Sequence, residues 1–225
     1  MKQSPHLRYF ALSVTLCAAL LPVCSAIAAP FAVPKATLQP PQVTFSEVSN
    51  FTPVNGLTIN GFTFTESIPM SFTAPSSNGP GNSNNISGDI ALSSLGSIPA
   101  GYNLTVSLAT PAQSFGFGFA LQGSTTVANA VTLTLFSGST NLGSLVFAGA
   151  PDPAFTGGFA GIGNNGFFNM VQITFNESFP AFALDNFAAQ TSVPETGGTL
   201  LMLCTSAAPL GIFALLRRRS FQARK

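Results

Sequence analysis

Residues 114–121 read Ser-Phe-Gly-Phe-Gly-Phe-Ala-Leu, and this stretch decides the fold. Its alternation of phenylalanine with glycine is typical of a β-strand, because successive side chains of a strand point to opposite faces. One face of this strand would carry rings, and the other almost no side chain. We interpret the rings as core packing and the glycines as the place where another sheet or loop comes close. An aromatic platform for a ligand is the alternative.

Alternation of apolar with small polar residues recurs along the rest of the chain. Such patterns occupy residues 43–48, 57–65, 70–72, 104–108, 130–136, 142–147, 158–162, 170–175 and 181–187. Turn-forming residues separate them, and no convincing helical period appears between them. These short strands predict an all-β, antiparallel, two-sheet sandwich in one domain of about 160 residues.

Charged residues are scarce in this chain. They make up 7% of its 225 residues, against about 25% in an ordinary soluble domain. Between residues 29 and 191 the one cation is Lys35, and six acidic residues bring the net charge of this region to −5. The lack of a basic stripe outside the C-terminal end excludes nucleic-acid binding, and 46% apolar residues exclude a charge-driven disordered chain.

Cysteine and histidine are absent from the same region. Cys17, Cys24, Cys204 and His6 all lie nearer to the two ends of the chain. Zinc sites made of Cys and His, Ser-His-Asp triads, Cys-His pairs and haem ligation therefore have no residues to use in the domain. Without disulfides, the domain depends on its core for stability.

The first 28 residues have the parts of a secretory signal peptide. A basic start precedes an apolar run over residues 9–29, which ends in small residues. Cleavage after Ala28 would place Ala26 at the −3 position, where the signal peptidase needs a small residue. An uncleaved anchor is the alternative. The large Val23 before Cys24 argues against a lipoprotein.

Residues 199–216 form an uncharged apolar run near the other end. Eighteen residues at 1.5 Å each span about 27 Å, enough for one transmembrane helix. The stop-transfer cluster Arg217, Arg218 and Arg219 follows at once, and the positive-inside rule places the basic tail, residues 217–225, in the cytoplasm. We therefore expect the sandwich to lie outside the cytoplasmic membrane. A buried core helix is the less favoured alternative.

Residues 192–198 read Ser-Val-Pro-Glu-Thr-Gly-Gly, directly before this apolar run. The proline removes a backbone donor and disfavours helix at its predecessor, so the motif would stay extended and accessible. The order of short motif, apolar helix and basic tail resembles the sorting signal of PEP-CTERM bacterial surface proteins, especially the variant with a Val-Pro-acid-small-Gly motif. This resemblance implies that an exosortase recognises the motif and removes the helix. The recognition residues and their variable neighbours would be Val193, Pro194, Glu195, Thr196 and Gly197.

Two alternatives to this sorting route stay open. Thr196 stands where the family most often has proline, and Val-Pro-Glu-Thr-Gly also resembles the Leu-Pro-x-Thr-Gly signal of sortases. The near absence of a spacer before the apolar run favours an exosortase. A single membrane span that is never cleaved is the other alternative.

The order of the predicted strands carries a second resemblance, over residues 42–188. From Val-Thr-Phe-Ser-Glu at its start to Phe-Ala-Leu-Asp-Asn-Phe at its end, this region resembles the jelly-roll, carbohydrate-module-like ectodomains that recur in PEP-CTERM proteins. Residues 29–41 and 189–198 would be linkers. In calcium-bearing jelly rolls of this kind, acidic residues near the first and last strands hold a structural ion, which implies Glu47 and Asp185 as Ca²⁺ ligands here. Separate, solvated carboxylates and a side-chain turn at Asp185 are the alternatives.

These observations favour an exported, non-catalytic protein of the cell surface or extracellular matrix that binds polysaccharide. It would be anchored in the cytoplasmic membrane before processing. The Asn-rich segment 78–85 and the turn 163–166 are candidates to hydrogen-bond sugar hydroxyls.

Two other functions remain as alternatives. A glycan-acting enzyme that uses two carboxylates needs no histidine; Glu47, Glu66 and Asp185 are its candidates, although no local motif surrounds them. A self-associating structural protein is the second alternative, because strands with few charges are poorly protected against edge pairing.

Overall fold

The structure is a computed structural model, and it describes residues 29–68, 72–76, 84–86, 88–93 and 99–191. The predicted signal peptide, sorting motif (193–197), transmembrane helix (199–216) and basic tail (217–225) lie outside these residues. Within the described ranges, no helix is long and apolar enough to cross a membrane.

The described chain is almost entirely β-structure, as predicted. One short 3-10 helix, η1 (Lys35–Leu38), accompanies eleven strands in the described part. The strands are β1 (Phe31–Ala32), β2 (Thr52–Pro53), β3 (Thr58–Ile59), β4 (Phe62–Glu66), β5 (Phe72–Ser76), β6 (Ile90–Ser93), β7 (Tyr102–Leu121), β8 (Val127–Ser137), β9 (Thr140–Pro151), β10 (Thr156–Phe175) and β11 (Phe182–Gln190). All the pairings between them are antiparallel.

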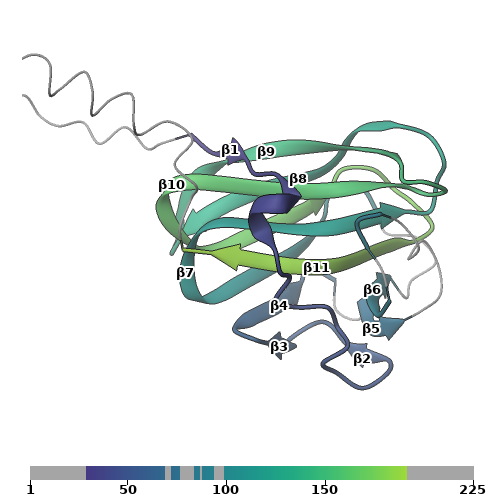
Figure 1. The fold of residues 1–225 in the computed structure, drawn as a ribbon, viewed down its shortest axis with the longest axis horizontal. Helices are drawn as coiled ribbons and strands as arrows, with labels where there is room; N and C mark the ends of the chain where they lie inside the picture. The colour runs from purple at the N-terminus through teal and green to yellow at the C-terminus, as the bar shows by residue number, and fades with distance from the viewer. Residues whose placement is uncertain (1–28, 69–71, 77–83, 87, 94–98, 192–225) are drawn as a thin grey trace, which may run out of the picture.

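The strands β7 and β10 organise the sheet, because each is 20 residues long and pairs with the other along most of its length (Figure 1). The first part of β7 also pairs with β4, and its second part with β11. Near its end β10 pairs with β8, and nearer its beginning it pairs with β1. The β7–β10 register shifts between Gly163 and Met170, and irregularities of this kind bend strands. Because both long strands bend, the one continuous sheet folds over on itself and forms two layers.

Aromatic side chains fill the space between the two layers. Phe64 of β4 and Phe187 of β11 come from different layers, yet their ring centroids are 5.2 Å apart. The ring of Phe187 also stacks on Phe117 at 5.0 Å. All three side chains are fully buried. Aromatic pairs contribute about 0.5–1.5 kcal/mol each beyond the area that they bury.

The glycine face of β7 is covered by two closely packed segments. A Cβ on Gly116 would lie 2.8 Å from the Cδ1 of Leu38, and one on Gly118 would lie 2.1 Å from the carbonyl oxygen of Asn85. We name residues 30–38 the N-terminal strap; it contains β1 and η1 and crosses this layer in Figure 1. The prediction that another segment comes close at these glycines is confirmed, and the aromatic platform is wrong because the rings are buried.

Several sequence predictions differ from the observed strands. The patterns at 104–108 and 114–121 belong to one strand, β7, and the predicted turn 163–166 lies inside β10. The sequence predicts an end of a strand at each of these places, because the bends of β7 and β10 contain turn-forming residues. The predicted strand 43–48 is reduced to a single bridge at Val43, since Phe45 has a φ of 59° and the chain turns.

The predicted strand 57–65 is in fact the hairpin β3–β4. Ile59 pairs with Phe62, so the connection has only two residues, Asn60 and Gly61. Their φ angles are 48° and 85°, as a type I′ turn requires at both central positions. Asn-Gly is the usual sequence of that turn, and this hairpin places Asn60 at the mouth of the groove described below.

Candidate functional site

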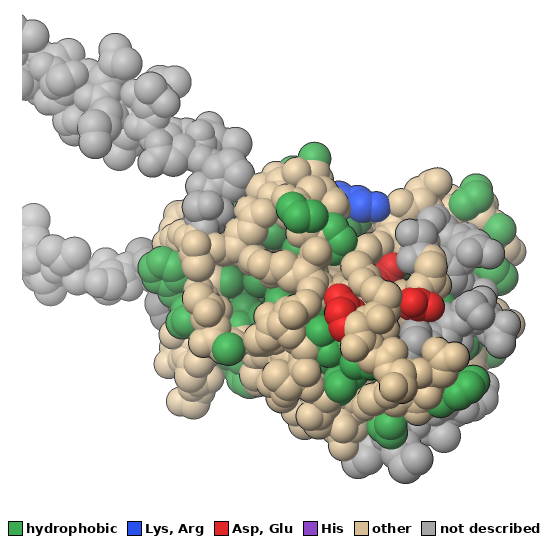
Figure 2. All heavy atoms as spheres, turned by 60° about the horizontal axis from the view of Figure 1, so that its bottom comes forward, with side chains coloured by type: hydrophobic (Ala, Val, Ile, Leu, Met, Phe, Trp, Pro, Cys, Tyr) green, Lys and Arg blue, Asp and Glu red, His purple; other side chains and the backbone are tan. Residues whose placement is uncertain are grey.

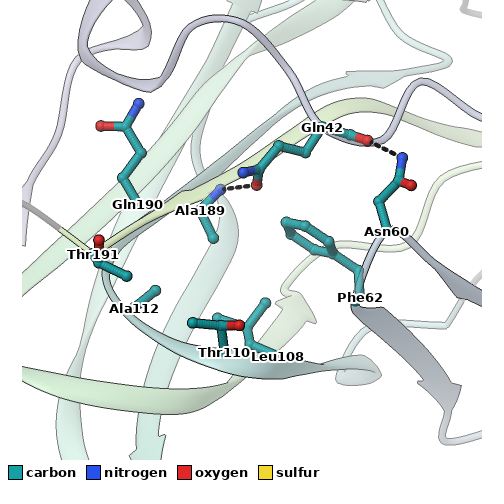
Figure 3. A pocket seen from close by; sticks show the side chains of 10 residues that line it. Gln42, Asn60, Phe62, Leu108, Thr110, Ala112, Ala189, Gln190 and Thr191 are labelled. Carbon is teal, nitrogen blue, oxygen red and sulfur yellow. Dashed lines mark hydrogen bonds between the residues drawn. The ribbon is translucent and has the colours of Figure 1, made fainter.

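A groove opens where four segments that are distant in sequence come together (Figure 3). These segments are the chain at Gln42, the β3–β4 turn, the bend of β7 and the end of β11. The cavity volume is about 420 Å³. Its lining residues are Gln42, Asn60, Gly61, Phe62, Leu108, Thr110, Ala112, Ala189, Gln190 and Thr191.

Backbone hydrogen bonds fix the walls of the groove. The N–H of Ala109 donates to the carbonyl of Gly61 at 2.8 Å, which ties the β7 bend to the hairpin turn. The N–H of Gln42 donates to the carbonyl of Phe187 at 2.7 Å, so this part of the chain is held beside β11. Backbone hydrogen bonds thus join the four segments of the groove in two pairs.

Two side-chain amides at the mouth are oriented by their own hydrogen bonds. The Oε1 of Gln42 accepts from the N–H of Ala189 at 2.9 Å, and the Nδ2 of Asn60 donates to the carbonyl of Gln42 at 2.7 Å. Among the described residues, the Nε2 of Gln42 and the Oδ1 of Asn60 have no hydrogen-bond partner. One oriented donor and one oriented acceptor therefore remain for a ligand.

The floor of the groove is apolar and its rim is neutral. Phe62, Leu108 and Ala112 are buried, and Figure 3 shows the ring of Phe62 beside the two amides. The rim adds the hydroxyls of Thr110 and Thr191. None of the ten lining residues is charged. This combination suits a neutral ligand with hydroxyl groups and some apolar surface.

The two carboxylates implied as calcium ligands lie in different surroundings. Glu47 is exposed, and its oxygens accept from the backbone N–H of Thr44 at 3.2 and 3.3 Å and from the Thr44 hydroxyl. Asp185 is fully buried, and its Oδ1 accepts from the N–H of Asn186 at 2.6 Å. Glu47 is thus engaged within its own turn. The described residues contain no group of three or more acidic, His or Cys side chains suited to a metal ion. The calcium site stays a prediction.

Glu66, the other carboxylate considered for catalysis, also has a structural role. Its side chain is 6% exposed, and its Oε1 accepts from the backbone N–H of Phe72 at 2.8 Å. The hydrogen bond holds the end of β4 against the start of β5. On the face shown in Figure 2, a few acidic side chains lie near one another.

The described part of the Asn-rich segment, residues 84 and 85, is held to the body of the protein. The Nδ2 of Asn85 donates to Asp152 at 2.6 Å, and its carbonyl accepts from Asn186 at 2.9 Å. Lys35 donates to the carbonyl of Asn84 at 2.9 Å. These bonds fasten the segment across Gly118. Residues 78–83 lie outside the described residues.

The other predicted sugar-binding segment, residues 163–166, forms part of the bend of β10. Asn164 is 2% exposed, and its Oδ1 accepts from the N–H of Gly166 at 2.8 Å. The carbonyl of Asn165 accepts from the side chain of Gln113 at 3.0 Å. The amide of Asn164 thus stabilises the bend and does not line the groove.

Sequence reasoning did not find the groove, because its residues come from positions 42, 60–62, 108–112 and 189–191 and share no local motif. The Asn60-Gly61 pair was the one sequence signal for this site, because Asn-Gly is typical of a hairpin turn. A hairpin turn at that point breaks the pattern 57–65 and exposes one asparagine beside an aromatic residue.

Comparison with known proteins gives no family. No family model matches the chain, and no curated protein matches it. Among solved structures, the chain is similar to a variant of a family 29 carbohydrate-binding module, at 10% identity and a TM-score of 0.36, covering 64% of this chain and 94% of the module. A variant of that module complexed with mannohexaose gives 9% identity and a TM-score of 0.37, with 64% and 91% covered.

A third solved structure is the catalytic domain of a GH87 alpha-1,3-glucanase variant in complex with tetrasaccharides. It has 16% identity and a TM-score of 0.36, and the match covers 64% of this chain and 30% of the glucanase chain. Likeness at this level shows neither the family nor the function of this chain.

Proposed function

We propose that this protein is an exported, non-catalytic protein of the cell surface or extracellular matrix that binds a neutral polysaccharide in the groove. The observation that carries the proposal is the pair of oriented amides, Gln42 and Asn60, above the apolar floor at Phe62. A sugar ring has the matching features, because its hydroxyls both donate and accept and its C–H faces are apolar.

The charge distribution favours a neutral sugar over an acidic one. The lining has no cation to pair with a uronate or sulfate group, and the region 29–191 carries a net charge of −5. The negative charge of the protein would repel an acidic polysaccharide. Its acidic groups would also lose hydration on binding without gaining an ion pair. The volume of about 420 Å³ has room for about one or two sugar rings.

Binding without turnover is part of this proposal. Hydrolysis by a carboxylate pair needs two acidic side chains about 5–10 Å apart on either side of the bond that breaks. The groove lining contains no carboxylate, and the Glu66 carboxylate is engaged with the backbone of β5. The groove therefore offers no carboxylate pair to a glycan-acting enzyme.

Export and sorting complete the proposed function. The signal peptide (1–28) would send the chain across the membrane, and the span at 199–216 with Arg217–Arg219 would hold it there. An exosortase would then recognise the motif at Val193, Pro194 and Glu195 and remove the helix. The groove residue Thr191 stands only two positions before Val193, so processing would take place next to the groove along the chain.

Binding to immobilised polysaccharides tests the groove. We expect the exported protein to be retarded in affinity electrophoresis by at least one neutral glucan, mannan or galactan, and not by alginate or heparin. Gln42→Glu should weaken this binding about tenfold, because it removes the free donor while keeping the acceptor for Ala189. Gln122→Glu, at an exposed glutamine outside the groove, should leave binding unchanged.

Three results would contradict the proposal. Retardation by no neutral polysaccharide would remove the ligand class. Equal loss of binding in the Gln42 and Gln122 variants would attribute the effect to charge alone. Release of reducing sugars that stops on Glu66→Gln or Asp185→Asn would support the enzyme instead.

A further inference from the structure

The sheet ends at β9, and most of this strand is paired on one side only. Residues 140–149 of β9 have one described partner strand, β8, whereas Ala150 and Pro151 pair with β10. An edge of this kind presents unpaired backbone N–H and C=O groups to any strand that approaches. Such an edge normally carries some protection.

The usual protection of an edge strand is missing from the middle of β9. No charged residue occurs in the sequence between Asp89 and Asp152, so neither β8 nor β9 carries a lysine or a carboxylate. The proline of β9 is its last residue, Pro151. At the other end, Gly143 has a φ of 113° and an added Cβ would lie 2.7 Å from Pro30, so the N-terminal strap covers that position. The unprotected part is residues 144–148.

The side chains of this part leave apolar surface uncovered on both faces. Val146, on the outer face, is 53% exposed. Leu145 and Phe147 point the other way, toward the core, but are only partly buried. Their partners on β8, Leu133 and Val131, are fully buried because a strand lies on each side of them. Another strand beside β9 would complete the burial of Leu145 and Phe147.

We propose that β9 pairs antiparallel with β9 of a second copy of this chain, about a twofold axis at Val146. In that register Val146 faces its own copy, Leu145 faces Phe147, and Ser144 faces Ala148. Every opposed pair is uncharged, and the half-buried leucine and phenylalanine cover each other. The strand is thus complementary to itself, which a twofold interface requires.

The location of the acidic residues agrees with a second copy as the partner. The net charge of −5 arises from carboxylates at 47, 66, 89, 152, 177 and 185, none of which is on β8 or β9. Two copies would therefore meet along neutral strands. The pairing leaves the groove open, because no residue of β9 lines it. It does not depend on the proposed sugar binding, and a dimer would carry two grooves.

Sedimentation velocity of the exported protein tests this pairing. We expect reversible, concentration-dependent dimers in the micromolar range. Val146→Lys should raise the dissociation constant about 100-fold, because two ammonium groups would meet at the axis. The control, Ser107→Lys, adds the same charge at an exposed position of β7 inside the sheet and should dimerise like the unchanged protein.

A charge exchange distinguishes this register from other modes of association. Val146→Glu should also be monomeric, but an equimolar mixture of the Glu and Lys variants should recover a dimer, since opposite charges then face each other across the axis. A wild-type protein that stays monomeric throughout the range would overturn the proposal. Dimers of Val146→Lys as tight as those of the unchanged protein, or a mixture that stays monomeric, would do so as well.

Discussion

In one layer of the sandwich, the outer face of β7 is covered, because Gly118 lies under the backbone of Asn85. In the other layer, the outward residues of β8 are Thr132 and Thr134, and both are half-exposed. Both strands alternate large apolar residues with small ones. The difference lies in what covers the outer face: glycine occurs where a second segment packs against the sheet, and threonine where water does. The first layer is therefore fixed on two faces, while the second keeps a free face and a free edge.

The largest test of this comparison is to remove one ring from each layer. Phe117 is fully buried and stacks on Phe187, whereas Phe136 of β8 faces outward and is half-buried. Phe117→Ala should lower the free energy of unfolding by about 3–5 kcal/mol, since it opens a cavity in the aromatic core. Phe136→Ala should cost about 1 kcal/mol. Chemical denaturation of both variants measures the difference, and similar losses would contradict the assignment of faces.

A smaller test adds a single methyl group to the covered face. In Gly118→Ala the new Cβ would start 2.1 Å from the carbonyl oxygen of Asn85, so the covering segment must shift. We expect a loss of about 2–3 kcal/mol in the free energy of unfolding. The control is Gly158→Ala on β10, where the nearest atoms are 3.6 Å away, and it should cost less than about 1 kcal/mol. If the two substitutions cost the same in thermal unfolding, the covering of Gly118 is not tight.

Much of the fold followed from the alternation of residues. The stretch 114–121 predicted a strand with buried rings and a closely covered face, and the structure has both. What the pattern could not show was that β7 and β10 continue through their bends, because the bends contain the same residues as turns. Pairing with neighbouring strands decides between the two, and it comes from distant parts of the chain.

The site was harder to predict than the fold. The polar residues favoured as sugar contacts were the asparagines of local turns, but Asn85 and Asn164 are engaged in holding the structure. The groove instead uses Gln42 and Asn60, which are close only because the chain at Gln42 pairs with β11 and the hairpin turns beside it. The alternation of residues shows which face of a single strand is apolar, but it does not show which distant segments lie side by side.

The most direct test of the sugar-binding claim is a titration followed by NMR. The side-chain amide signals of Gln42 and Asn60 in the exported protein would be recorded as a neutral oligosaccharide, taken from the polysaccharide that retards the protein, is added. We expect these two amides to shift together and to saturate with one binding constant, while the amide of Gln122 stays unchanged. Saturable shifts confined to other residues, or no shifts at all, would contradict the assignment of the groove.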